Sequence, residues 1–243
     1  MTDIAFTKMH GLGNDFVIID TRDNPCELSP ERVMAIADRH TGVGCDQVIL
    51  LESPSSNPHL RDADVFIQIF NADGSQVYAC GNATRWVANI IMLESARTSI
   101  NIGTGDTLLT AERLANGLIG VDMGCPQFDW RDIPLSSEQD TLDLNIKNFP
   151  LKNATAVNMG NPHCVIFVDD PDAVALEEIG PTLEYHDLFP ERTNIGIAQI
   201  KNAGELRLRV WERGSGITRA CGTGACAAAV LAHRRNLTGR KVF

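Results

Sequence analysis

The feature that most constrains the fold is an internal repeat. The segment Val65–Arg85 matches Leu206–Cys226 at a constant offset of 141 residues, and both read as a strand, a polar turn, Ala-Cys-Gly and a small-residue helix. A second match lies upstream in the same order, where GNDFVIID from Gly13 resembles GNPHCVIFVD from Gly160. Two ordered matches are hard to attribute to chance. We therefore expect two similar halves related by a pseudo-twofold axis.

The repeat also places the domain boundary. A chain of 243 residues can form one large domain or two of about 120 residues. The repeat favours two, with the boundary near Asn116–Met123. We expect an N-terminal half, 1–118, that carries Cys80 and a C-terminal half, 119–243, that carries Cys221.

Local patterns predict a mixture of strands and helices. Short apolar, β-branched runs predict strands at 16–19, 48–51, 65–70, 118–121, 165–168 and 206–211. Ser29 and Pro30 mark the start of one helix, with Gly42 just past its end, and two more helices are expected directly after Cys80 and Cys221. The fold class is α/β or α+β.

Composition and charge exclude several partners. The chain has 31 acidic against 21 basic residues, a formal charge of -10, which repels nucleic acid and anionic lipid. The longest apolar run, Ala225–Ala232, is far shorter than a membrane span. Asp3 and Lys8 interrupt any signal-peptide pattern. We expect a cytoplasmic protein that binds neither nucleic acid nor membrane.

The cysteines indicate thiol chemistry. There are seven, an odd number, and no C-x-x-C pair occurs, which argues for reduced thiols and against a structural metal. Five of them are interpreted as small buried packing residues: Cys26, Cys45, Cys125, Cys164 and Cys226.

Cys80 and Cys221 are different because each stands before a glycine at a predicted helix start. Unpaired N–H groups there favour an anion, either a thiolate or a ligand carboxylate. A thiol pKa lowered from about 8.5 to about 7 would make the group a usable base. Two such thiols on opposite sides of a substrate can invert a stereocentre, one removing a proton and the other delivering one, without a cofactor.

Each residue also has a simpler interpretation. The two cysteines could be packing residues or form a disulfide, His163 could be a strand-end histidine, and Glu212–Arg213 an exposed ion pair. The repeat favours function, because Glu212 lies nine residues before Cys221, where a carboxylate could help to deprotonate the thiol. Four asparagines, which could be turn residues, are better explained together as groups that bind a zwitterionic ligand: Asn14, Asn71, Asn161 and Asn194.

At these residues the chain resembles the diaminopimelate epimerase family, cofactor-independent enzymes that interconvert LL- and meso-diaminopimelate on the route to lysine and peptidoglycan. The resemblance runs nearly end to end. It is carried by MHGLGNDFVIID, GVGCDQVILL, FNADGSQVYACGNATR, NMGNPHCV, RTNIGIA and WERGSGITRACGTGACA. The resemblance implies two pseudo-symmetric domains, each a curled mixed sheet around a central helix, in a protein that often forms homodimers.

The resemblance also implies roles for individual residues. Cys80 and Cys221 would be the acid and base, with His163 assisting Cys80 and Glu212 assisting Cys221. Substrate contacts would come from Asn14, Gln47, Asn71, Gly81, Asn82, Asn161, Asn194, Glu212, Arg213, Gly222 and Thr223. Gln47 is predicted to contact the substrate only because of the resemblance.

Two departures stand out. Ala83 and Trp86 occupy positions where many relatives have glycine and cysteine, and chemistry should survive this variation. The chain also ends at Phe243, where relatives continue through further strands, so we expect the second half to be cut short, with consequences for closure and dimerisation.

Two other functions remain open. One is a related amino-acid racemase similar to proline racemase, whose substrate lacks a distal amino-acid end. The other, from a different class, is a catalytically inert, thiol-regulated binding protein in which Cys80 and Cys221 form a disulfide.

Overall fold

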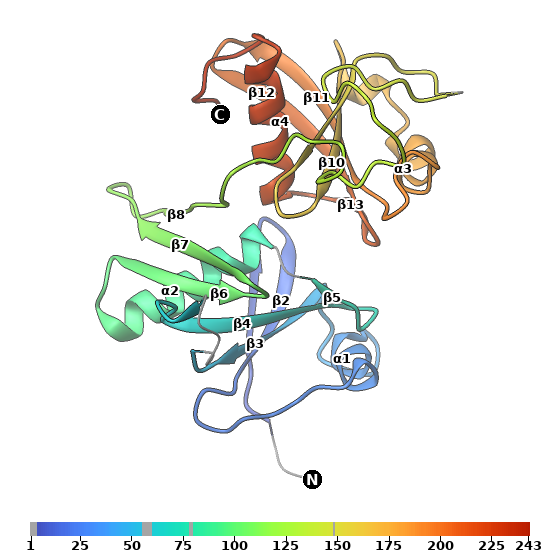
Figure 1. The fold of residues 1–243 in the computed structure, drawn as a ribbon. Helices are drawn as coiled ribbons and strands as arrows, with labels where there is room; N and C mark the ends of the chain where they lie inside the picture. The colour runs from blue at the N-terminus through green and yellow to red at the C-terminus, as the bar shows by residue number, and fades with distance from the viewer. Residues whose placement is uncertain (1–3, 55–59, 78–79, 148) are drawn as a thin grey trace. The chain divides into compact units, whose positions relative to one another are not determined.

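The computed structural model describes residues 4–54, 60–77, 80–147 and 149–243, so that residues 78 and 79 of the repeat lie outside the described residues. The chain divides into two compact units, Met1–Met123 and Gly124–Phe243 (Figure 1). The first unit contains Cys80 and the second contains Cys221.

In the first unit the strands form one mixed sheet. Their order is β1-β2-β3-β4-β6-β7-β8, with β5 paired to β4. The pair β2 and β3 is parallel, whereas β3 and β4 are antiparallel. The bounds are β1 Thr7–Gly11, β2 Asn14–Asp20, β3 Gln47–Glu52, β4 Val65–Asn71, β5 Gln76–Val77, β6 Ser99–Thr104, β7 Thr107–Arg113 and β8 Ile119–Val121.

Two helices cover opposite faces of this sheet. Successive side chains of a strand point to opposite faces, so Val17 of β2 packs with α1, Pro30–Ala37, and its neighbour Phe16 packs with α2, Gly81–Ser95. The apolar runs that predicted these strands are continuous because both faces are buried. Helix α2 is therefore a central helix against the larger apolar face.

Helix α1 begins as predicted and ends earlier than Gly42. Ser29 is its N-cap, with the hydroxyl accepting from the N–H of Arg32 at 3.4 Å. The last helical residue is Ala37, because the carboxylate of Asp38 accepts from the N–H of Thr41 and turns the chain before Gly42 is reached.

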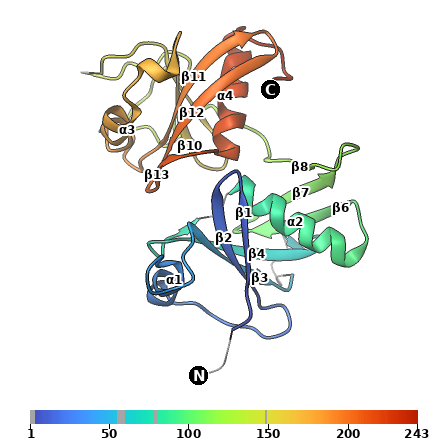
Figure 2. The same cartoon turned by 180° about the vertical axis from the view of Figure 1, so that it is seen from behind.

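The second unit has the same plan on a smaller sheet, ordered β13-β12-β11-β10-β9. Figures 1 and 2 show α3 and α4 on opposite sides of its strands. The bounds are β9 Ala154–Asn158, β10 Pro162–Phe167, η2 Pro171–Ala173, α3 Leu176–Glu184, β11 Asn194–Asn202, β12 Glu205–Glu212, β13 Gly216–Thr218 and α4 Gly222–Arg234.

The topology explains the internal repeat. In each unit an antiparallel strand precedes a parallel pair joined through a helix, and a hairpin then leads into the central helix. The run β1-β2-α1-β3-β4-β5-α2 corresponds to β9-β10-α3-β11-β12-β13-α4. The expected α+β class and the pseudo-symmetric sheets around central helices are confirmed.

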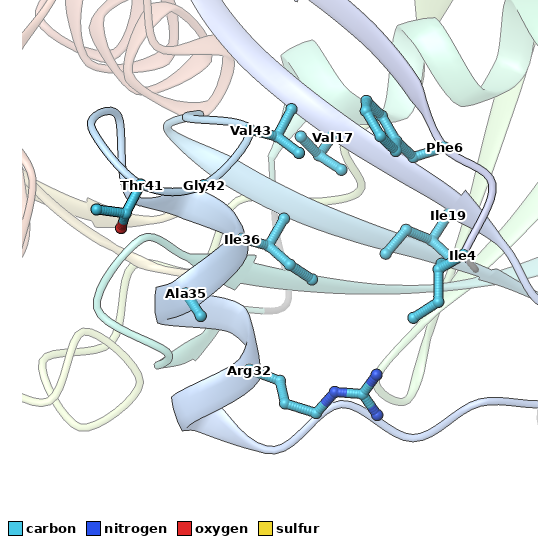
Figure 3. A pocket seen from close by; sticks show the side chains of 10 residues that line it. All are labelled: Ile4, Phe6, Val17, Ile19, Arg32, Ala35, Ile36, Thr41, Gly42 and Val43. Carbon is cyan, nitrogen blue, oxygen red and sulfur yellow. The ribbon is translucent and has the colours of Figure 1, made fainter. Parts of the chain in front are cut away.

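A pocket of about 460 Å³ lies between α1 and the neighbouring strand β2 (Figure 3). Figure 3 shows apolar side chains of both elements pointing into it, with the guanidinium of Arg32 at one side. Its lining is Ile4, Phe6, Val17, Ile19, Arg32, Ala35, Ile36, Thr41, Gly42 and Val43. None of the residues predicted to carry chemistry lines this pocket.

Within the described ranges, no helix is both long and apolar enough to cross a membrane.

Candidate active site

Cys80 is the N-cap residue of α2, as predicted. Its backbone is extended, with φ -146° and ψ 97°, and the helix begins at Gly81. The carbonyl of Cys80 accepts from both the N–H and the hydroxyl of Thr84 at 2.9 Å, which fixes the first turn. Gly81 and Asn82 are buried while Cys80 is half-buried. The cysteine therefore lies at the positive end of the central helix.

Predicted ligand residues of the first unit gather at one edge of its sheet. Asn14 begins β2, Gln47 begins β3 and Asn71 ends β4, and the strand directions bring these three ends together. Gln47 and Asn71 are register partners, and Gln47 Nε2 donates to Asn71 Oδ1 at 3.0 Å. Gln47 Oε1 is buried and makes no hydrogen bond within the described residues.

The start of α2 reaches this same edge. Gly11 pairs with Asn14 across β1 and β2. A Cβ built at Gly11 would lie 3.7 Å from Cβ of Asn82 and 2.9 Å from Nε1 of Trp86. The Trp86 departure from the family pattern is therefore a packing contact between α2 and β1.

An ionic cluster that the sequence did not reveal supports this edge. Asp15 and Asp46 each accept from the other's backbone N–H, at 3.0 and 2.9 Å, and Arg39 contacts both carboxylates at 2.7 Å. Burial acts to raise the pKa of Asp15, but hydrogen bonds from Arg39 and Lys8 outweigh it and hold this pKa well below its usual value. Asp15 follows Asn14 in the sequence, and Asp46 precedes Gln47. This position next to two predicted substrate-binding residues was the one sequence signal that could have indicated the cluster.

Cys221 is the N-cap residue of α4. Its backbone is extended, and its Sγ accepts from the N–H of Gly224 at 3.4 Å, as a serine cap would. Sγ also lies 3.4 Å from the hydroxyl of Thr223, and the helix begins at Gly222. The residue is 9% exposed and carries a free thiol.

Glu212 forms a hydrogen-bonded pair with Cys221. The carboxyl group at the end of β12 interacts with this thiol and accepts from the hydroxyl of Thr218. Burial raises the pKa of Glu212. Burial first, and then the charge of Glu212, raise the pKa of Cys221 to about 12. Cys221 is therefore a protonated thiol at neutral pH.

This protonation state corrects the expectation of a thiol pKa lowered by the helix start. A helix N-terminus stabilises an anion by about 0.3 to 1 kcal/mol, less than about one pKa unit. Burial shifts a pKa by up to about 3 to 5 units. At Cys221 the effect of burial is the larger of the two.

The remaining predicted residues of the second unit also meet at one sheet edge. His163 and Asn194 are register partners at the starts of β10 and β11. His163 Nε2 lies 2.9 Å from Oδ1 of Asn161. Oδ1 of Asn194 accepts from the N–H of Arg213 at 3.0 Å.

His163 is a neutral base. It is 1% exposed, and burial, together with the positive charge of Arg213, lowers its pKa to about 3. At neutral pH it therefore has one ring nitrogen able to accept a proton.

The five remaining cysteines do not all match their predicted packing role. Cys45 and Cys164 are buried, and Cys26 and Cys226 are half-buried, but Cys125 is exposed, so the prediction was wrong for Cys125. It lies in the segment just after the boundary of the two units, where Gly124 and Pro126 flank it and no strand or helix forms. In the part of the chain that the structure describes, no three His, Cys, Asp or Glu side chains cluster where a metal could bind.

The fold is shared with several solved structures. A phenazine biosynthesis protein of the PhzF family from Bacillus anthracis is 20% identical, with a TM-score of 0.60 over 94% of this chain and 77% of that chain. A hydroxyproline epimerase from Agrobacterium vitis, with bound trans-4-hydroxy-L-proline, is 14% identical, with a TM-score of 0.63 over 96% of this chain and 78% of that chain. At these identities the likeness concerns the fold alone.

Sequence comparison identifies the class and then the family. Curated relatives are epimerases, which places the chain among the isomerases. "Diaminopimelate epimerase" of Rhodospirillum centenum is 52% identical over 98% of this chain and 80% of the relative, and that of Acidiphilium cryptum is 51% identical over 97% and 83%. A family model described as diaminopimelate epimerase matches residues 6–128 and 155–242. The chain belongs to the diaminopimelate epimerase family.

Proposed function

We propose that this chain interconverts LL- and meso-diaminopimelate by proton transfer between two cysteines, Cys80 and Cys221, without a cofactor. The observation that carries the proposal is the repeated unit itself. In a member of this family, each of two topologically equivalent sheets leads through a hairpin into a helix whose N-cap is cysteine.

The chemistry requires one thiolate and one thiol. The thiolate removes the proton on the substrate α-carbon, the C–H electron pair passes into the neighbouring carboxyl group, and the second thiol protonates the carbon from the opposite side. At the end the first cysteine is a thiol and the second is a thiolate. The reverse reaction uses the same two groups with exchanged roles.

The protonated state of Cys221 supports the role of acid for this residue in one direction of the reaction. Burial keeps the Cys221 thiol protonated in the free protein. In the reaction direction that begins from this protonation state, Cys221 acts as the acid and Cys80 acts as the base. Glu212, hydrogen-bonded to Cys221, takes part in returning its proton. His163, a neutral imidazole, assists Cys80.

Substrate binding is assigned to the two sheet edges and the two helix starts. The N–H groups at Gly81–Asn82 and Gly222–Thr223 would hold the α-carboxylate and stabilise the charge that develops on it. Arg213 would bind a second carboxylate. Neutral donors and acceptors for the amino groups and the chain come from Asn14, Gln47, Asn71, Asn161 and Asn194.

The unpaired acceptor of Gln47 supports this assignment. A buried oxygen without a hydrogen bond costs about 1 to 3 kcal/mol, and an ammonium N–H of the substrate would satisfy it. A substrate without a distal amino-acid group would leave this acceptor unused, which favours diaminopimelate over proline.

We further propose that the protein works as a homodimer in the cytoplasm, on the route to lysine and peptidoglycan precursors. Membership of the family supports this proposal.

The test is turnover by the 243-residue chain under reducing conditions. LL-diaminopimelate should be converted to the meso form, L-proline should not be racemised, and both outcomes should persist in Cys226→Ala, a matched cysteine on α4. Racemisation of proline alone would favour the racemase. Inactivity, with a thiol titration showing that reductant releases a Cys80–Cys221 disulfide, would favour the binding protein.

A further inference from the structure

Glu184 is a buried carboxylate that the mechanism does not use. It ends α3, and its side chain is 2% exposed. Oε2 accepts from the indole N–H of Trp211 at 2.7 Å, and Oε1 accepts from the backbone N–H of Gly214 at 2.9 Å. The guanidinium of Arg192 lies 3.9 Å away. A buried charge is tolerated only where it is paired and hydrogen-bonded, and Glu184 meets both conditions.

The two hydrogen bonds bracket the residues assigned to catalysis and binding. Trp211 immediately precedes Glu212, and Gly214 immediately follows Arg213. One carboxylate therefore holds both ends of a four-residue stretch. This stretch leads into the turn between β12 and β13, which is closed by the N–H of Ser215 donating to the carbonyl of Glu212 at 3.0 Å.

The geometry of the strand then determines the direction in which the Glu212 side chain points. Neighbouring side chains of a strand point to opposite faces. Trp211 packs into the apolar cluster on the α3 face, whereas Glu212 reaches Cys221 at the start of α4. Glu184 thus acts from the face opposite to the reacting thiol.

The close approach of α3 completes the arrangement. A Cβ built at Gly180 would lie 2.4 Å from Cδ2 of Trp211, so the helix packs directly against the indole ring through a glycine. Gly180 and Glu184 are one helical turn apart and share a face. One contacts the ring, and the other binds its N–H.

We propose that Glu184 is a positioning residue, which fixes the Trp211–Gly214 stretch so that Glu212 meets the Cys221 thiol and Arg213 meets the substrate carboxylate. The inference rests on the proposed function. Glu184 touches neither thiol nor substrate, and it acts through Trp211 and Gly214.

Glu184→Gln tests the proposal with almost no change of volume. Glutamine has one acceptor oxygen, but the site presents two N–H donors, so its amide N–H₂ must face one of them. We expect kcat/KM to fall on the order of 10- to 100-fold, the cost typical of misplacing a group by about 1 Å. KM should rise because Arg213 is displaced from the substrate carboxylate, and kcat should fall because Glu212 is displaced from the Cys221 thiol. The pH profile of kcat/KM should shift for the same reason. Glu178→Gln, exposed on the same helix, is the matched control and should behave as wild type.

Trp211→Phe provides a rescue. In Glu184→Gln/Trp211→Phe the indole N–H is gone, so the glutamine oxygen can accept from Gly214 without facing a second donor. The double variant should recover activity relative to Glu184→Gln, which a double-mutant cycle reports as coupling. No recovery, or a Glu184→Gln variant with wild-type KM, kcat per folded molecule and pH profile, would overturn the proposal.

A second readout is independent of turnover. If Glu184→Gln displaces Glu212, the rate at which a small thiol reagent modifies Cys221 should change its pH dependence, and Glu178→Gln should leave it unchanged. An inactive wild type would contradict the proposed function, yet this measurement would still decide the role of Glu184. If the pH dependence of the Cys221 modification rate is unchanged in Glu184→Gln, the proposed positioning role of Glu184 is overturned.

Discussion

The carboxyl group of Glu212 hydrogen-bonds the thiol of Cys221, and its charge raises the pKa of that thiol, whereas the hydrogen bond from the thiol acts to lower the pKa of Glu212. Removing the charge of Glu212 should therefore lower the pKa of Cys221, although burial will still keep it above an ordinary thiol pKa. We expect Glu212→Gln to increase the modification rate of Cys221 by methyl methanethiosulfonate several-fold at pH 8, while epimerisation falls on the order of 10² to 10⁴-fold.

Peptide mass spectrometry resolves Cys221 from the other cysteines in this experiment. Cys164, which is fully buried in the same unit, serves as the internal control and should stay unmodified. A slower reaction at Cys221 in Glu212→Gln would show that Glu212 promotes the thiolate in the free protein, and would contradict the raised pKa of Cys221.

His163 should stay neutral until strongly acidic pH. Its folded pKa of about 3 lies below the value of 6.5 in the unfolded chain, so the unfolded state takes up a proton first and stability is lost as pH falls from about 6.5 toward 3. In His163→Gln the free energy of unfolding should decrease less than in the wild type over this pH range. Imidazole NMR would record the titration, and protonation of His163 near pH 6 in the folded protein would refute its burial as a neutral base.

Asp15 should stabilise the first unit above acidic pH. Its folded pKa is depressed, so its contribution is present above the unfolded value of 3.8 and is lost as pH falls below it. We expect Asp15→Asn to lower unfolding free energy by about 1 kcal/mol at pH 7, and the difference from wild type to shrink below about pH 4. Chemical denaturation at several pH values measures this, and a difference that grows on acidification would be inconsistent with the cluster.

Gly180→Ala should strain the contact between α3 and Trp211. The added methyl group overlaps the indole ring, and overpacking of this kind costs about 1 to 3 kcal/mol. Gly204→Ala, where the nearest neighbour of the new Cβ would be 3.7 Å away, is the control and should change stability little. Thermal denaturation with equal melting temperatures for both variants would contradict the packing.

Strands β2, β3 and β10 were predictable because their apolar runs are continuous and buried, whereas β12 was predictable from the alternation of apolar and arginine side chains in Leu206–Trp211. Helix α3 was missed because Gly180 and Pro181 lie inside it, and both residues ordinarily end helices. The structure shows why Gly180 is tolerated, because it admits the ring of Trp211.

A repeated motif marked the candidate site residues Cys80 and Cys221, and their predicted place at two helix starts is confirmed. Glu184 had no such mark, because a single glutamate beside Tyr185 in LEYHD reads as a solvated surface residue. Its burial depends on tertiary packing with Trp211, 27 residues away in sequence. The protonated state of Cys221 was missed for a related reason, since burial cannot be read from a helix start.

Exchange of the substrate α-proton in deuterated water tests whether the two cysteines act on one carbon. Wild type should incorporate deuterium while converting LL- to meso-diaminopimelate, and Cys226→Ala should do the same. Cys80→Ala and Cys221→Ala should each lose epimerisation on the order of 10² to 10⁴-fold or more. Undiminished epimerisation and exchange in either of these two variants would contradict the account.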